Sequence, residues 1–444
     1  MRNLLFPLVL LIVPIQGVTD LNARGLQESE TPGPSEADAH LAELARGVEK
    51  QVAEIRGLEF KRPVEVHFAD KERFVEYYHS MEDRMGGAEL TKKEELMAVL
   101  LQLIPSDVDL GALQEELLAT QVGGFYDPAT DAFYVMEGLE DDLIRIIMSH
   151  ELTHALDDQH YDLAAKDKEL MDNNDSLLAH HAVIEGSAQV VMNRWLVQNL
   201  ASLDRAALLQ FQAKMDAQEL LSAPRLLWKP FFALYMQGQA FLCRKDRFSM
   251  FATADIADLD RAFQNLPVST EQILHPGKYW TKEDVDLPHR VKQGLARLPE
   301  GWSAFHSSIL GELYLGLLCG PADGEVTAAS ITKLNYTDAS TSGWGGDRVQ
   351  ILAKGDSRVL ILDTFWDTAG DAREFQEALD GRETPEGSDV QSVVVRQTDS
   401  QWVRLVAWTS ASKDDALNVA STVPASASRS GTISGLMTPE PQTK

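Results

Sequence analysis

The chain has 444 residues, of which 44% are apolar, so it can bury a large core and, at the usual domain size, form about two or three domains. Its 68 acidic residues outnumber its 40 basic residues and give a formal net charge of −28. Because nucleic-acid binding requires a basic surface, this charge argues against DNA or RNA as a partner.

The N-terminus has the layout of a cleaved signal peptide. It reads MRNLLFPLVLLIVPIQG, which is one arginine, a short apolar run and a small residue, Gly17, at a possible cleavage position. The run is too short to span a bilayer comfortably, and no cysteine follows it to accept a lipid. We therefore expect residues 1–17 to direct export to the periplasm, the cell envelope or the medium, and the mature chain to have no stable membrane span.

The next residues form a spacer before the folded part of the chain. Residues 18–38 include ESETPGPSE, a polar and proline-rich stretch that is typical of a flexible linker. Apolar residues then recur at three- and four-residue steps from Ala39 to Ile55, which predicts a helix. A strand at 63–68 and a helix from Lys71 follow, so folding is expected to start at residue 39.

The middle of the chain is predicted to be mainly helical around one hairpin. Aromatic and small residues alternate around a Pro-Ala-Thr-Asp turn at 122–136, which predicts a β-hairpin. A helix over 139–157 opens with acidic residues, and a second long helix covers 176–200. Further helical stretches fill 204–265, so we take residues 39–330 as one mainly helical domain with a small sheet.

The sequence changes in character after about Thr337. Strand, strand, helix, strand, strand and helix patterns follow one another from VQILAK to DDALNVAS, which indicates a small α+β module over 331–420. The last residues, 421–444, are of low complexity and are expected to be disordered. The chain as a whole is therefore predicted to be an α+β protein with two folded parts.

The helix predicted over 139–157 carries the most specific motif of the chain, HELTH. His150 and His154 are four residues apart, so on a helix they face the same side and can bind one tetrahedral metal ion. Glu151 lies beside the first histidine, where its carboxylate can take a proton from a water on the metal and pass it to a departing amine. This is the HExxH signature of zinc-dependent peptidases, so Zn²⁺ is the expected cofactor.

A catalytic zinc ion needs a third protein ligand, and the sequence offers two candidates. His160 follows His154 by six residues, which is the spacing of the metzincin pattern HExxHxxGxxH, but Asp157 stands where that pattern has glycine. The glycine lets the chain turn sharply so that the third histidine reaches the metal, and aspartate adopts that backbone less readily. We favour Glu185, because HExxH on one helix and glutamate on the next is the gluzincin arrangement.

Four stretches together resemble a group of bacterial zinc metallopeptidases of the gluzincin type: GFYDPATDAFYV, HELTHALDDQHYDL, VIEGSAQ and STEQILHPGKY. The resemblance covers roughly residues 40–320. It implies a zincin-like fold in which His150, His154 and Glu185 hold zinc and the glutamate of HExxH is the general base. It also implies a peptide or protein substrate and makes the 122–136 hairpin a rim of the substrate cleft.

The sequence departs from the thermolysin-like pattern near the third ligand. That pattern has an aspartate four residues after the glutamate ligand, where this chain has Gln189. The group that orients a metal-binding histidine must then come from elsewhere, with Asp158 as one candidate. His181, one turn before Glu185, can be a residue that orients a metal ligand, a substitute ligand or a structural histidine. Gly186, beside Glu185, either allows close helix packing at the metal or is simply a small residue in a helix contact.

Peptide hydrolysis also needs a group that stabilises the oxyanion. Enzymes of the gluzincin type commonly add a histidine or a tyrosine from a later segment, and His275 and Tyr279 in LHPGKY are the candidates by position. The same segment can equally be a structural loop fixed by Pro276 and Gly277.

Two interpretations stand beside the gluzincin-type peptidase. One is the metzincin-type site that uses His160, and the other is a binding protein in which zinc has no catalytic role. Glu151 favours catalysis, because a purely structural site has no need of a general base. The two cysteines, Cys243 and Cys319, fit one disulfide and two free thiols equally well.

Overall fold

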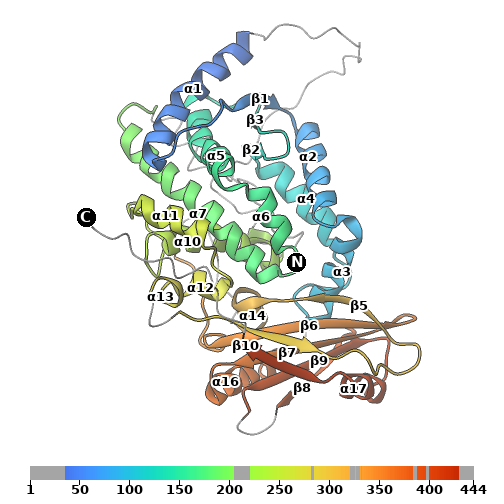
Figure 1. Cartoon of the computed structure of the whole chain (residues 1–444). Helices are drawn as coiled ribbons and strands as arrows, with labels where there is room; N and C mark the ends of the chain where they lie inside the picture. Colours follow the sequence, from blue (N-terminus) through green and yellow to red (C-terminus); the bar gives the residue numbers. More distant parts are fainter. Residues whose placement is uncertain are drawn as a thin grey trace, which may run out of the picture.

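The computed structural model describes residues 36–204, 221–281, 285–320, 333–383, 388–396 and 400–429, together with Val326 and Ile331. The predicted signal peptide and almost all of the predicted linker lie outside these residues. The first helix begins at Glu36, so the folded part starts slightly before the expected residue 39. The chain is a mixed α+β protein, as predicted, with a helical body and a C-terminal sheet (Figure 1).

Helices form most of the body. Their bounds are α1 (Glu36–Arg56), α2 (Lys71–Arg84), α3 (Gly87–Leu100), α4 (Leu110–Gln121), α5 (Asp141–Tyr161), α6 (Leu163–Leu170), α7 (Asn174–Asn199), α10 (Arg225–Leu242), α11 (Ile256–Gln264), α12 (Thr270–Leu274), α13 (Gly277–Trp280), α14 (Gly311–Cys319), α16 (Ala369–Asp380) and α17 (Lys413–Ser421). The strands are β1 (Glu65–Ala69), β2 (Gly124–Asp127), β3 (Ala132–Met136), β4 (His289–Gln293), β5 (Ser303–Ser308), β6 (Trp344–Lys354), β7 (Ser357–Trp366), β8 (Gln391–Arg396), β9 (Trp402–Thr409) and β10 (Ala425–Arg429). The predicted hairpin is present as β2 and β3, and the two long predicted helices are present as α5 and α7.

Helix α7 is the central helix of the body. It is buried along almost its entire length, because α10, α5 and α1 pack against it. Its crossing with α10 is very close: a Cβ atom added to Gly186 would lie 2.4 Å from the carbonyl carbon of Gly238, so no side chain fits between the two backbones. Gly186 therefore lies at a close helix contact, as both interpretations of this residue require, and the contact fixes the position of the neighbouring Glu185 in the core.

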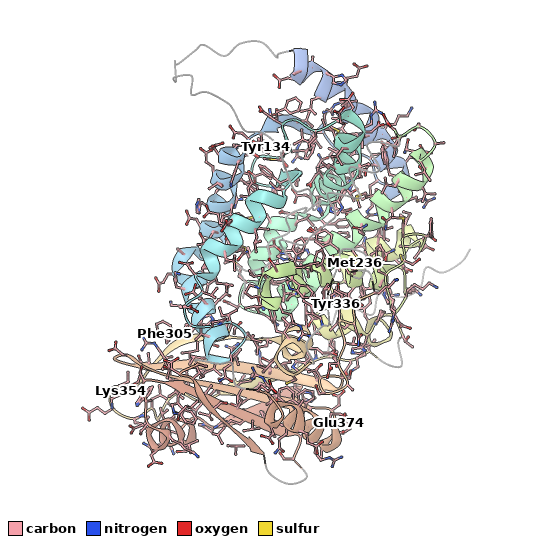
Figure 2. The ribbon with its side chains drawn as sticks, turned by 180° about the vertical axis from the view of Figure 1, so that it is seen from behind. Tyr134, Met236, Phe305, Tyr336, Lys354 and Glu374 are labelled. Carbon is pink, nitrogen blue, oxygen red and sulfur yellow. The ribbon has the colours of Figure 1, made fainter. Side chains whose placement is uncertain are left out.

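A small three-stranded sheet lies beside α5. Its order is β1-β3-β2, in which β1 runs parallel to β3 and β2 runs antiparallel to β3. β2 is therefore an edge strand, and it packs against α5. Figure 2 labels Tyr134 of β3 at one end of the molecule, with Lys354 and Glu374 of the C-terminal part at the other end.

Five antiparallel strands form the C-terminal sheet, in the order β5-β6-β7-β9-β8. Alternate residues of the central strands enter two apolar layers. One face, with Val349 and Leu360, joins the core of the helical body and α16, and the other, with Leu352 and Ile361, packs under α17. At the edge, Phe305 of β5 lies beside α3 (Figure 2). The sheet thus shares a hydrophobic core with the helical body.

The limits of the C-terminal part differ from the predicted ones. β5 belongs to the C-terminal sheet although it precedes residue 331. The expectation of disorder over 421–444 is wrong at 421–429, because α17 extends to Ser421, Val423 is buried, and β10 pairs antiparallel with β4. The sequence ASASR is of low complexity, but its small side chains suit a strand that takes its hydrogen-bond partners from a distant segment. Residues 430–444 lie outside the described part of the chain.

Both cysteines are free thiols. Burial raises the pKa of Cys243 to about 11 and also raises that of Cys319, so both are protonated and unreactive at neutral pH. Over the residues for which the structure gives positions, no helix has the length and apolar character needed to cross a bilayer.

Candidate metal centre

Helix α5 presents the HExxH motif to the interior of the body. Its first turn carries Asp141 and Asp142, which favour a helix N-terminus, and it continues without a break to Tyr161. His150 and His154 therefore lie one turn apart, with their ring centroids 4.8 Å from each other. Both side chains are buried, because α1, α7 and the small sheet pack around this helix.

Glu185 of α7 lies opposite these two histidines. Its Oε2 atom is 3.2 Å from Nε2 of His150 and 3.6 Å from Nε2 of His154. Two ligands that hold one tetrahedral zinc ion at roughly 2.0–2.1 Å are about 3.3–3.4 Å apart. The structure therefore brings the three predicted ligands together at a spacing that suits zinc.

The donor atoms also fit a zinc ion in their chemistry. Nε2 of His154 and Oε1 of Glu185 are buried, and neither has a hydrogen-bond partner among the residues that the structure describes. A buried polar atom without a partner is costly, and an ion among these side chains would satisfy both atoms. Two imidazoles and one carboxylate are also a ligand set found in zinc hydrolases.

The electrostatic surroundings favour the protonation states that bind zinc. Burial is the main influence on the pKa of His150 and lowers it to about 4, so this imidazole is neutral at neutral pH. Burial alone would raise the pKa of Glu185, but the attraction of His154 and the hydrogen bond with His150 outweigh it and lower this pKa to about 2. A neutral imidazole and an ionised carboxylate are the forms that coordinate zinc.

The small sheet holds Glu151 beside the metal centre. The backbone N–H of Tyr126 in β2 donates a hydrogen bond of 2.9 Å to Oε2 of Glu151, whereas Oε1 has no partner in the described chain. Burial, together with the negative charge of Glu185, raises the pKa of Glu151 well above its usual range. A carboxylate with a raised pKa holds a proton more strongly than an ordinary glutamate, and the oxygen of Glu151 without a partner is the one that can accept it.

A cavity of about 350 Å³ opens beside these residues, and Glu151 and His154 lie on its wall. The rest of the wall comes from α2, β2, α6 and α7 and the residues next to them, and much of it is apolar. These lining residues are Tyr77, Met81, Arg84, Met85, Tyr126, Pro128, Leu163, Ala164, Asp167, Lys168, Met171, His181 and Ile184. The candidate base and one candidate ligand thus face space that a substrate can occupy.

His160 does not belong to the metal centre. Because α5 continues past it, its Nε2 points to the backbone carbonyl of Glu59, 2.9 Å away. Asp157, at the position of the metzincin glycine, is helical and buried, and it accepts hydrogen bonds from Arg56 (2.7 Å) and Ser187 (2.6 Å). The structure therefore gives no support to the metzincin alternative.

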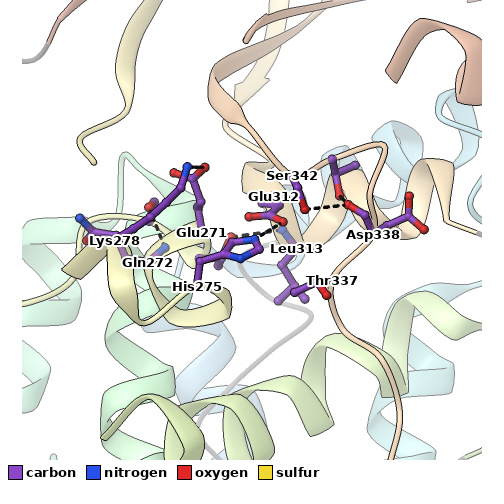
Figure 3. Close-up of polar contacts among 12 residues, drawn as sticks. Glu271, Gln272, His275, Lys278, Glu312, Leu313, Thr337, Asp338 and Ser342 are labelled. Carbon is purple, nitrogen blue, oxygen red and sulfur yellow. Dashed lines mark hydrogen bonds and ion pairs between the residues drawn. The ribbon is translucent and has the colours of Figure 1, made fainter. Parts of the chain in front are cut away.

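The two predicted oxyanion donors lie away from the cavity. Nε2 of His275 is 2.8 Å from Oε1 of Glu312, at the junction with the C-terminal sheet (Figure 3). The hydroxyl of Tyr279 donates to the carbonyl of Asn265 (2.6 Å), and its ring packs against Phe241. Their segment forms the short helices α12 and α13, of which α12 packs on α7, α10 and α14. The structure does not bring either residue to the metal ligands.

The contacts behind the ligands also differ from the expectation. Asp158 accepts hydrogen bonds from the hydroxyl of Tyr126 (2.9 Å) and the N–H of Leu163 (2.9 Å), and neither ring nitrogen of His154 has a hydrogen-bond partner among the described residues. Gln189 donates to a residue of its own helix. Neither residue orients a metal-binding histidine.

Two cavity residues gain importance from the structure. The sequence points to His181 through its one-turn spacing from Glu185, but no sequence pattern points to the residue that contacts its ring. That partner is Asp167 of α6, whose Oδ1 is 3.0 Å from Nε2 of His181. Asp167 stands in an ordinary charged helix, so only the three-dimensional structure identifies it.

Comparisons with known proteins assign no function to this site. Residues 301–422, which include the C-terminal sheet, match a family described as a domain of unknown function, DUF8575. No curated protein matches the chain. A crystal structure from Chloroflexus aurantiacus, described as that of "a putative hydrolase with a novel fold", is 21% identical, with a TM-score of 0.38, over 57% of this chain and 92% of that chain. Similarity at this level carries no argument about function.

Proposed function

We propose that the chain is a zinc-dependent peptidase in which His150, His154 and Glu185 hold zinc and Glu151 is the general base. One observation carries this proposal: two separate helices bring three donor atoms within 4.8 Å of one another, next to a cavity that Glu151 also lines. The spacing of HExxH in the sequence predicts only the two histidines and the base. The third ligand, Glu185, lies 31 residues after His154 on a separate helix, so the packing of α7 against α5 brings it to the two histidines.

Each residue has a defined task in this mechanism. A zinc ion, when bound, supplies Lewis-acid chemistry, because it polarises the carbonyl of a peptide bond and lowers the pKa of water. Glu151, with its Oε2 fixed by the N–H of Tyr126, takes a proton from the attacking water on Oε1 and then passes it to the leaving nitrogen. The protonated form of Glu151 that exists between these steps is favoured by the burial that raises its pKa.

The surroundings of the cavity support a peptide as the substrate. The edge strand β2 and the turn after it contribute Tyr126 and Pro128 to the wall, and an extended peptide can align beside a strand edge. Met81, Met171 and Ile184 line the same cavity and suit an apolar side chain. The sequence resemblance to gluzincin-type peptidases agrees with this substrate class, and the N-terminal segment supports export of the enzyme.

Zinc content and proteolysis together test the proposal. The chain is purified from residue 18 onward, its zinc is measured by elemental analysis, and its cleavage of the unstructured protein casein is followed. Glu151→Gln should keep zinc and lose activity by about 100-fold or more, because it keeps the shape of the side chain and removes the base. His160→Ala is the matched control on the same helix, and it should keep both zinc and activity.

Three results would count against this function. A chain that takes up no zinc, or an undiminished rate of hydrolysis in Glu151→Gln, would contradict the proposed mechanism. Bound zinc without hydrolysis by either the wild type or the variant would favour the non-catalytic zinc-binding protein instead.

A further inference from the structure

A second group of side chains of the types that can bind a metal ion lies at the same cavity as the candidate zinc centre. Asp167 of α6 and the adjacent His180 and His181 of α7 bring three donor atoms within 4.8 Å of one another. One oxygen of Asp167, Oδ1, is 3.0 Å from Nδ1 of His180 and 3.0 Å from Nε2 of His181. Both imidazoles are buried, and the Asp167 side chain is only 20% exposed.

We propose that Asp167, His180 and His181 form a second zinc site. The donor set is two imidazoles and one carboxylate, the same set that the HExxH helix and Glu185 provide. In both groups a carboxylate oxygen lies 3.0–3.6 Å from the imidazole nitrogens, near the separation of about 3.3 Å between ligands of a tetrahedral zinc ion. A set of this composition also leaves a coordination position open for water or substrate.

The turn between α5 and α6 places Asp167 over the two histidines. Asp162 ends α5 in the left-handed backbone conformation, with φ of 54°, and its side chain caps α6 by accepting a hydrogen bond from the N–H of Ala165. Helix α6 therefore folds back against α7. Adjacent side chains on a helix point about 100° apart, so His180 and His181 converge only on a group that lies above the space between them. Asp167 occupies that place.

The second group faces the same cavity as the candidate catalytic residues. Asp167 and His181 line this cavity together with Glu151 and His154. His181 precedes Glu185 by one helical turn, so their Cβ atoms are neighbours on α7, roughly 5–6 Å apart. The role of the second ion rests on the proposed peptidase function. Its positive charge would stabilise the oxyanion that forms during hydrolysis. The two predicted oxyanion donors in LHPGKY lie away from the cavity and cannot do this.

A third cluster of acidic side chains in the described chain differs from these two groups, because a lysine already lies among its carboxylates. Glu271, Asp286 and Asp367 gather near one another, but Nζ of Lys278 lies 2.6, 2.8 and 3.4 Å from their oxygens, respectively. Figure 3 shows Lys278 beside Glu271. The ammonium group already supplies the positive charge that three carboxylates require. The partners of Asp167 are instead two imidazoles, which are themselves metal ligands.

Zinc stoichiometry tests the second site directly. The purified chain is incubated with excess Zn²⁺, freed of unbound ion and analysed for zinc and protein. The wild type should hold two zinc ions per chain, and His180→Ala and His150→Ala should each hold one. Asp167→Asn keeps the size of the side chain and a hydrogen-bond acceptor but loses the negative charge, so it should also hold one. His160→Ala, outside both groups, should hold two.

Cobalt(II) gives a readout that is independent of activity. The His150→Ala variant should still take up one Co²⁺ and show the visible absorption of a low-symmetry four-coordinate ion. The double variant, His150→Ala with His180→Ala, should show no such absorption. Circular dichroism of each variant identifies any that fails to fold, and Asp167→Asn provides the same test with a smaller change of shape.

The possible results separate this inference from the proposed function. One zinc ion in the wild type that is retained in His180→Ala and Asp167→Asn but lost in His150→Ala would overturn the second site and leave the proposed peptidase centre intact. One zinc ion that is lost in His180→Ala but retained in His150→Ala would support the second site and contradict the ligand set of the proposed function.

Discussion

At the residue scale, the candidate centre depends on the negative charge of Glu185. This side chain is fully buried, and its carboxylate is the one anionic member of the His150–His154–Glu185 set. Loss of a group that hydrogen-bonds to a metal ligand typically weakens metal binding by roughly 10–100-fold. Glu185→Gln changes a ligand itself, so we expect it to weaken zinc binding at this centre by more than this. The substitution keeps the volume of the side chain, so the loss reports on charge rather than on packing. Competition with a chromogenic chelator measures it.

The metzincin alternative supplies the control for this measurement. His160→Ala removes an imidazole from the same motif region, but its Nε2 contacts a backbone carbonyl, so zinc affinity should not change. If zinc binding instead fell in His160→Ala and stayed at the wild-type level in Glu185→Gln, the gluzincin-type ligand set would be wrong.

The sequence predicts residues well where their geometry is local. His150, Glu151 and His154 follow from helical spacing alone, and the structure places them as expected. The position of Glu185 depends on the packing of two helices, and the resemblance to a known family was needed to choose it. The prediction for His275 rests on its place along the chain, which says nothing about where its helix packs, and the structure places its ring beside Glu312 and not in the cavity.

At the scale of elements, the packing of α7 against α10 fixes the position of Glu185. A Cβ atom on Gly186 would meet the backbone of Gly238, and backbone atoms cannot move aside as a flexible side chain can. Gly186→Ala should therefore destabilise the fold by about 1–3 kcal/mol, the usual cost of overpacking, and should weaken zinc binding by displacing Glu185. Urea denaturation and zinc competition measure the two effects.

Gly47 of α1 offers a matched control for this prediction. It is exposed, and a Cβ atom added there would meet nothing within 4 Å. Gly47→Ala should stabilise the protein by about 0.5–1 kcal/mol, because alanine favours the helix. Both substitutions replace glycine by alanine, so opposite changes in stability would show that the close crossing of α7 and α10 causes the loss in Gly186→Ala. A stabilising effect of Gly186→Ala would show that α7 and α10 do not pack as closely as the structure indicates.

Elements were predictable where one segment carries its own periodic pattern. The long helices and the β2–β3 hairpin show clear helical or alternating patterns, and they appear within a few residues of the expected bounds. β4, β5 and β10 were missed because they are short and polar or rich in small residues, so their burial pattern is weak. Such strands form because a distant partner offers hydrogen bonds, and no local pattern records that partner.

At the scale of the whole molecule, the helical body and the C-terminal sheet are joined by one hydrophobic core. Apolar residues of α7, α10 and α14 and of one sheet face belong to the same buried cluster. The sequence predicted two folded parts, because helical patterns give way to strand patterns after about Thr337. It could not show that their apolar surfaces meet, since a pattern identifies a buried face without identifying what covers that face.

The N-terminal end of α7 reaches this junction. Oδ1 of Asp175 accepts hydrogen bonds from the N–H (3.0 Å) and the hydroxyl (2.5 Å) of Thr270 in α12. Gly311, at the start of α14, approaches so closely that a Cβ atom there would lie 1.8 Å from the same oxygen. Burial raises the pKa of Asp175 to about 7, although the hydrogen bonds from Thr270 oppose the rise.

This pKa makes the junction sensitive to pH. The folded state keeps a proton on Asp175 that the unfolded state releases, so stability should fall as the pH rises from about 4 towards about 7. Asp175→Asn cannot ionise and keeps an acceptor for Thr270, so between pH 5 and pH 8 it should lose less stability than the wild type, by about 1 kcal/mol or more. Urea denaturation of the metal-free proteins at both pH values measures the difference.

Asp109→Asn, at an exposed helix cap, should keep the wild-type pH dependence. An identical pH dependence in Asp175→Asn and the wild type would mean that Asp175 is already ionised in the folded protein at pH 5.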